Sequence, residues 1–147
     1  MHSSGLIELI EGRAEGLTRA VVQDLSMNPR TPSFRGVPRD EAAGRITALY
    51  RNLARWLAEH DDNAVRAAYE DWGRTRFKQH IPISEITYGV LVAKDHLRRH
   101  ARDHGLAELQ ALEAAVGEFF DRAVYYLVRG YEMQAATPPR SARGLLA

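Results

Sequence analysis

Apolar positions in the C-terminal third of the chain repeat at intervals of three and four residues, which is the spacing of one face of an α-helix. The main stripe consists of Leu109, Leu112, Val116, Phe119, Ala123, Leu127 and Gly130. A second apolar row beside it consists of Phe120, Val124, Val128 and Tyr131. Two adjacent rows make a helix apolar over much of its circumference. We therefore expect residues 106–135 to form a central helix that is contacted on several sides.

The same spacing predicts four further helices earlier in the chain. They are expected over residues 6–25, 38–60, 63–79 and 81–104. Pro38 and Pro82 suit the first turn of their helices, where the missing N–H of proline is no loss. The chain has neither a sustained alternation of apolar and polar residues nor an Asn-Gly or Asp-Gly hairpin turn. The fold class is therefore predicted to be all-α.

Two features inside the predicted helices allow more than one interpretation. Gly12 and Gly16 lie one turn apart in the first helix, where they indicate either a close crossing with another helix, which we favour, or a kink. Arg76 lies on the same face of the third helix as Trp72 and Gly73. We expect Arg76 to extend its charged end to solvent, although it could instead meet a buried acid or a ligand.

The chain divides into a short N-terminal segment, one helical domain and a tail. Residues 1–5 are expected to be a tag remnant or disordered, and residues 137–147 resemble a linker. Residues 6–136 form the domain, because a chain of 147 residues is long enough for one sizeable core. Residues 26–37 are its longest connection. We expect an ordinary surface loop there, with a functional segment as the alternative.

Composition excludes several kinds of site. The chain has no cysteine, which excludes disulfides, thiolate catalysis and cysteine-ligated metals. The formal net charge is +1, so no overall field would attract nucleic acid or an anionic membrane. No apolar run approaches the roughly 18 to 20 residues that span a bilayer, and the N-terminus lacks the pattern of a signal peptide. We expect a cytoplasmic protein with no nucleic-acid or membrane partner and no cofactor.

The most suggestive candidates for chemistry are three histidines at four-residue intervals, His96, His100 and His104. Two histidines at positions i and i+4 of a helix can hold zinc. However, no HExxH motif is present, and the arginines interspersed with these histidines would repel a cation. We therefore expect a partly exposed helix face without a metal. A helical enzyme or metal-binding bundle that uses this row is kept as an alternative.

The motifs of common enzyme sites are absent. The chain has no GxxxxGK[ST], no GxGxxG and no GxSxG sequence. No nucleophile and base can be paired from the sequence. Trp56, Trp72 and Phe77 are better explained as core residues than as the walls of a cofactor site. We therefore expect that the protein is not an enzyme.

Three segments resemble one bacterial regulatory family. Residues 119–132, FFDRAVYYLVRGYE, are similar to its closing helix. Residues 80–86, HIPISEI, resemble the GIPLSEV sequence that begins its penultimate helix, and residues 49–57 fit its LY…L..WL helix. On these motifs the chain resembles the N-terminal sensor domain of RsbR-type stressosome proteins, the RsbT co-antagonist type, which also precedes sensor histidine kinases. His80 stands where the pattern usually has glycine, which questions the local turn but not the fold.

The resemblance covers residues 6–134 and carries several expectations. It implies a globin-like bundle of five to six helices without haem. Domains of this kind are non-catalytic sensory modules, usually homodimeric, that pass a signal from the last helix to an output domain or a partner protein. The output domain in the family is a STAS domain or a kinase. The resemblance assigns no ligand-binding residue.

Two groups of residues are candidate sites for such a sensor. A pocket for a small apolar ligand is expected between the second, third and fourth helices. Its residues would be Trp56, Trp72, Phe77 and His100. The fourth and fifth helices are expected to pair with their copies in a homodimer. The interface would consist of Phe120, Val124, Tyr125, Val128 and Tyr131.

Other functions remain alternatives to this hypothesis. The chain could be a haem-binding sensor globin with His80 or His100 as the iron ligand, which a Soret absorption band would reveal. It could also be a scaffold in which dimerisation is the whole function.

Overall fold

The computed structural model describes residues 4–104 and 109–138, and this part of the chain contains five α-helices, one 3₁₀ helix and no strand. The elements are α1 (Ser4–Met27), η1 (Pro32–Gly36), α2 (Arg39–Glu59), α3 (Asp62–Lys78), α4 (Ile83–Asp103) and α5 (Leu109–Ala135). The predicted all-α class is confirmed. The expected start of the last helix at residue 106 lies outside the described residues, as do residues 1–3 and 139–147 of the two terminal segments.

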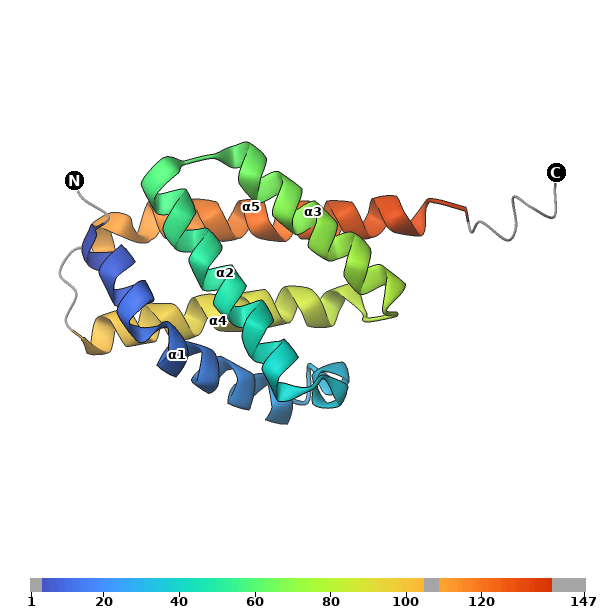
Figure 1. The fold of residues 1–147 in the computed structure, drawn as a ribbon, viewed down its shortest axis with the longest axis horizontal. Helices are drawn as coiled ribbons and strands as arrows, with labels where there is room; N and C mark the ends of the chain where they lie inside the picture. Colours follow the sequence, from blue (N-terminus) through green and yellow to red (C-terminus); the bar gives the residue numbers. More distant parts are fainter. Residues whose placement is uncertain (1–3, 105–108, 139–147) are drawn as a thin grey trace.

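The helices form a bundle in which α4 and α5 lie side by side and run in opposite directions (Figure 1). The first three helices pack across this pair (Figure 1), α1 against α2 and α4, and α3 mainly against α5. The buried stripe of α5 faces them, with Phe119, Ala123 and Leu127 inaccessible to solvent. The rings of Trp56 and Tyr69 pack on Phe119 with centroids 6.2 and 5.9 Å away. The last helix therefore contributes the centre of the core, as its apolar pattern predicts.

The crossing of α3 and α5 is possible because each helix has a glycine at the contact. A Cβ atom on Gly73 would lie 2.7 Å from the backbone nitrogen of Tyr131, and one on Gly130 would lie 2.7 Å from the carbonyl carbon of Glu70. No side chain fits at either position, because backbone atoms cannot rotate away. Sequence spacing instead predicted a close crossing at Gly12 and Gly16. That prediction is wrong, since a Cβ at either would have no described neighbour within 4 Å.

Hydrogen bonds join the two ends of α3 to α5. At the start of α3, Asp62 accepts from the hydroxyl of Tyr126 at 2.8 Å and from Nε of Arg122 at 3.0 Å. After the end of α3, the carbonyl of Ile81 accepts from the hydroxyl of Tyr131 at 2.8 Å. The aromatic residues of α5 thus fix both ends of the crossing that the two glycines permit.

The turn between α3 and α4 contains His80 in the left-handed region, with φ of 60°. Glycine adopts this region without strain, whereas a residue with a Cβ atom does not. The turn therefore forms with histidine in place of the expected glycine, at the cost of local backbone strain.

None of the described helices is long and apolar enough to cross a bilayer.

Candidate functional site

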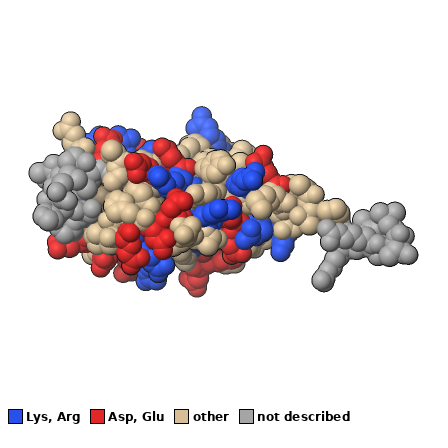
Figure 2. All heavy atoms as spheres, turned by 90° about the horizontal axis from the view of Figure 1, so that it is seen from above, with Lys and Arg blue, Asp and Glu red and all other residues tan. Residues whose placement is uncertain are grey.

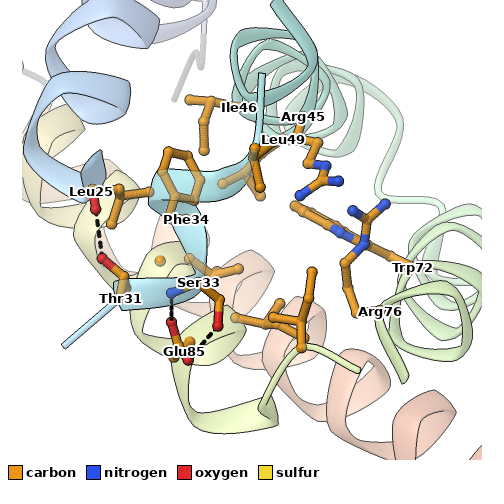
Figure 3. Close-up of a pocket in the computed structure, with 15 residues that line it drawn as sticks. Leu25, Thr31, Ser33, Phe34, Arg45, Ile46, Leu49, Trp72, Arg76 and Glu85 are labelled. Atoms are coloured by element: carbon orange, nitrogen blue, oxygen red, sulfur yellow. Dashed lines mark hydrogen bonds between the residues drawn. The ribbon is translucent and has the colours of Figure 1, made fainter. Parts of the chain in front are cut away.

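An apolar cavity lies where α1, η1, α2, α3 and α4 meet (Figure 3). The volume of the cavity is about 50 Å³, and part of the space around it is open to solvent. Its walls consist of Leu25, Thr31, Ser33, Phe34, Val37, Arg45, Ile46, Leu49, Trp72, Arg76, Ile81, Glu85, Ile86, Gly89 and Val90. Most of these side chains are aliphatic or aromatic, which is typical of small-molecule sites.

The segment between α1 and α2 forms one side of the cavity because hydrogen bonds hold it there. The buried Thr31 donates its hydroxyl to the carbonyl of Leu25 at 2.7 Å. The backbone N–H and the hydroxyl of Ser33 donate to the two carboxylate oxygens of Glu85 on α4, at 2.8 and 2.9 Å (Figure 3). These bonds place Phe34 and Val37 at the cavity. The segment is therefore more than the ordinary surface loop that we expected from its sequence.

The polar end of the cavity is formed by Arg45 of α2 and by Trp72 and Arg76 of α3, whose side chains gather on one side of it (Figure 3). Arg45 Nε, Trp72 Nε1 and both Nε and Nη1 of Arg76 are buried and have no hydrogen-bond partner among the described residues. Another nitrogen of the Arg45 guanidinium, Nη2, does have a partner, because it donates to a carboxylate oxygen of Glu41 at 2.8 Å. All four unpartnered atoms are donors.

Arg76 departs from its expected position. Two of its three guanidinium nitrogens are buried, so the prediction that its charged end extends to solvent is wrong for this part of the group. Burial lowers the pKa of Arg76 to about 10, and the neighbouring charge of Arg45 acts in the same direction, while Glu41 opposes them. The guanidinium remains protonated at neutral pH, so the cavity is bordered by a cation.

The four residues predicted for a ligand pocket do not meet in one place. Trp72 lines the cavity described above, whereas Trp56 lines a separate surface groove between α2 and α3. The ring of Phe77 packs on Tyr131 of α5, with centroids 5.2 Å apart. His100 packs on His104 at 4.2 Å, near the end of α4. The predicted pocket residues therefore do not line a single cavity in the structure.

Two of the three histidines in the predicted row make polar contacts within the chain, whereas His100 Nε2 is buried without a partner among the described residues. His96 Nε2 lies 2.8 Å from a carboxylate oxygen of Asp24 on α1. His104 Nδ1 lies 2.9 Å from the carbonyl of His100. Burial lowers the pKa of His100, and the charges of His104 and Arg13 act in the same direction. Within the described ranges, no group of three or more histidines, cysteines and acidic residues is placed to hold a metal ion.

The residues predicted for a dimer interface differ in exposure within the single chain. Phe120 is buried in the core, and Tyr131 is half-buried with its hydroxyl bonded to Ile81. Val124 and Val128 are half-buried, and Tyr125 is 61% exposed. Further along α5, Met133 is 44% exposed. Accessible apolar surface of α5 is thus concentrated at Tyr125 and Met133 rather than at Phe120.

Charged side chains of both signs are mixed on the face of the molecule seen in Figure 2. On α4, Arg99 pairs with Asp95 at 2.9 Å, and Arg98 pairs with Glu113 of α5. Two of the basic residues among the histidines therefore pair with acids of the same chain. The pairing is typical of a solvated helix face.

Sequence reasoning missed Arg45 and assigned Arg76 to solvent, although signals for both were present. Arg45 precedes the buried Ile46 and lies one turn before the buried Leu49, which places it at the edge of the core stripe of α2. Arg76 lies one turn after Trp72 on α3. Helical spacing alone places an arginine beside a core stripe, but whether its head turns inward depends on the space between helices.

Comparison with known proteins places most of the chain in one family model. The family described as the RsbT co-antagonist protein rsbRD N-terminal domain matches residues 11–143 of the chain, which is most of its length. No curated protein and no solved structure matches it.

Proposed function

Because the chain belongs to the RsbT co-antagonist protein rsbRD N-terminal domain family, we propose that it is a non-catalytic signalling domain with a haem-free globin-like fold. It acts in the cytoplasm as a homodimer. A signal received within the helical bundle passes through α5 to an output domain, either a kinase or a STAS domain, or to a partner protein.

The observation that carries this proposal is the apolar surface of the central helix. The Tyr125 side chain is 61% exposed although its neighbours on α5 build the core, and Val128 beside it is half-buried. On α4, which runs alongside α5, Leu91 is 45% exposed. An apolar face on two antiparallel helices can pair with its own copy about a two-fold axis to form a four-helix contact. Such a contact would connect the cores of two subunits through the helices proposed to carry the signal.

The test is the association state of the full chain and of one surface variant. We expect light scattering at micromolar concentration to show a dimer, and we expect Tyr125→Glu to weaken association at least tenfold, because it would bury a charge at the contact. Met27→Glu is the matched control, since Met27 is 71% exposed and belongs to α1 rather than to the two helices of the proposed contact. A monomeric wild-type chain, or equal effects of the two substitutions, would contradict the proposed dimer.

The alternative of a haem-binding sensor is tested separately by absorption. The cavity is lined by no histidine of the described part of the chain, and the two candidate ligands lie elsewhere. His80 is exposed in the turn before α4, and His100 packs on His104. The proposal for a haem-free domain is supported by this placement. A Soret band in the protein after incubation with haemin, lost in His100→Ala or His80→Ala, would favour the alternative.

A further inference from the structure

The cavity between η1, α2, α3 and α4 has apolar walls and one polar end made entirely of hydrogen-bond donors (Figure 3). Its unpartnered donors belong to Arg45, Trp72 and Arg76, and they find no acceptor anywhere in the described residues. An indole N–H and a guanidinium have no acceptor function. Buried donors without acceptors are costly, so such groups in native proteins are usually satisfied by water or a ligand.

The charge at this end of the cavity is also unbalanced. Two guanidinium groups, those of Arg45 and Arg76, lie near one carboxylate, that of Glu41. Glu41 accepts a hydrogen bond from Nη2 of Arg45 and not from the unpartnered Nε. A second carboxylate, that of Glu85 in the cavity wall, keeps its charge but lies apart from these two arginines (Figure 3), and its oxygens accept from Ser33 rather than from the unpartnered donors. Water would satisfy the N–H groups but would not neutralise the charge. An anion would do both, and it gains strength from the low dielectric of a buried site.

The remaining walls determine what the anion is attached to. They present aliphatic and aromatic groups, including Leu25, Phe34, Ile46 and Ile86. An inorganic anion would leave this apolar surface uncovered, whereas an organic anion with an apolar body would cover it. A planar carboxylate also matches the geometry of a guanidinium, which can donate two parallel N–H bonds to it.

The same three polar side chains form the wall through which a ligand could enter the cavity. Arg45, Trp72 and Arg76 also line a groove on the outer surface between α2 and α3. They therefore separate the cavity from solvent on that side. Changes of side-chain rotamer would open this wall while the helices stay in place, so a ligand could exchange without unfolding.

We propose that this cavity binds a small organic carboxylate with an apolar body, whose carboxylate accepts hydrogen bonds from Arg45, Trp72 and Arg76. The site would be the input of the signalling domain, and this role rests on the proposed function above. The binding itself can be measured without reference to any output.

Octanoate is the probe, and the reporter is the indole N–H of Trp72 in ¹H–¹⁵N spectra of the full chain. We expect octanoate to shift the Trp72 signal, assigned with Trp72→Phe, and to leave that of Trp56 nearly unchanged. Acetate lacks the apolar body and 1-octanol lacks the charge, so both should bind at least tenfold more weakly. The absence of any shift with millimolar octanoate would overturn the proposal, as would equal binding of octanoate and octanol, or tighter binding of inorganic phosphate.

Arg76→Met tests the cation, because it keeps much of the side-chain volume and removes the charge. We expect octanoate affinity to fall at least tenfold. Arg74→Met is the matched control on the same helix, where the arginine lies 3.9 Å from Asp71 at the surface, and its affinity should be unchanged. Equal losses in the two variants would overturn the assignment. Arg45→Met gives a second measurement of the same kind if Arg76→Met does not fold.

The outcome is independent of the dimer test. A monomeric chain whose Trp72 signal responds to octanoate would overturn the proposed dimer and support the site. A dimer without that response would do the reverse.

Discussion

His80 is held in a backbone conformation that its side chain does not favour. Its φ is 60°, its amide donates to the carbonyl of Phe77 at 2.9 Å, and its side chain is exposed. The left-handed conformation costs a residue with a Cβ atom about 1 to 2 kcal/mol. Glycine removes this strain but loses about 0.5 to 1 kcal/mol through the greater freedom of the unfolded chain. We therefore expect His80→Gly to stabilise the fold by about 0.5 to 1 kcal/mol in urea unfolding.

His60 provides a control for this prediction, because it also has a positive φ, of 53°. Its ring packs on Trp56 with centroids 4.6 Å apart, and glycine would lose that contact. His60→Gly should therefore give a smaller gain than His80→Gly, or a loss. If His80→Gly lowers the unfolding midpoint, then the strain is smaller than its backbone angle indicates, or the exposed imidazole makes contacts that stabilise the turn.

Individual residues of the cavity show where sequence reasoning ends. The spacing of α3 correctly placed Arg76 on the face of Trp72, and it left two orientations open. The choice between solvent and interior depends on the volume between α2 and α3, which is set by residues that lie far away in sequence. The sequence therefore allowed both orientations of the Arg76 side chain, and the packing of the helices determines which one it adopts.

At the scale of elements, the contact between α3 and α5 depends on Gly73 and Gly130. A Cβ atom at either position would meet backbone atoms of the opposite helix at 2.7 Å or less. We expect Gly73→Ala and Gly130→Ala each to destabilise the fold by about 2 to 4 kcal/mol, because the helices must separate to accept the methyl group. Thermal or urea unfolding followed by circular dichroism measures the effect.

Gly117 is the matched control on the same helix as Gly130. A Cβ atom there has no described neighbour within 4 Å, so Gly117→Ala should be neutral or should stabilise the helix by up to about 1 kcal/mol. Gly12→Ala on α1 should behave in the same way. Equal and small effects at Gly117 and Gly130 would show that the crossing adjusts easily and that its close packing contributes little.

The helices themselves could be predicted because their apolar spacing repeats over many residues, and the observed bounds follow it closely. The sequence did not indicate which glycines lie at a close crossing of two helices. Gly12 and Gly16 are one turn apart, as in many close crossings, yet their positions are open, whereas Gly73 and Gly130 have no second glycine one turn away on their helices. A close approach needs a glycine on both partners, and the sequence does not indicate which helices become partners.

At the scale of the whole molecule, α3 lies between the cavity and the helix proposed to carry the signal. Trp72 and Arg76 contribute to the cavity wall, while Gly73 on the same helix packs against α5. Ile81, just after α3, lines the cavity and accepts a hydrogen bond from Tyr131 of α5. A group that enters the cavity would therefore press on elements that touch α5 directly. This arrangement joins a cavity lined by five elements to a sixth, α5, so it could not be read from any one segment of the chain.

The hydrogen bond from Tyr131 to Ile81 allows the coupling between α5 and the cavity wall to be measured. Tyr131→Phe removes the part-buried hydroxyl and should lower the free energy of unfolding by about 1 kcal/mol. It should also speed hydrogen exchange at residues 79–82, because α5 no longer restrains the segment beside the cavity. Tyr126→Phe is the control, since its hydroxyl bonds to the exposed Asp62 at the opposite end of α3 and should contribute little. Unchanged exchange at residues 79–82 in Tyr131→Phe, or equal changes in both variants, would show that the cavity wall and α5 move independently.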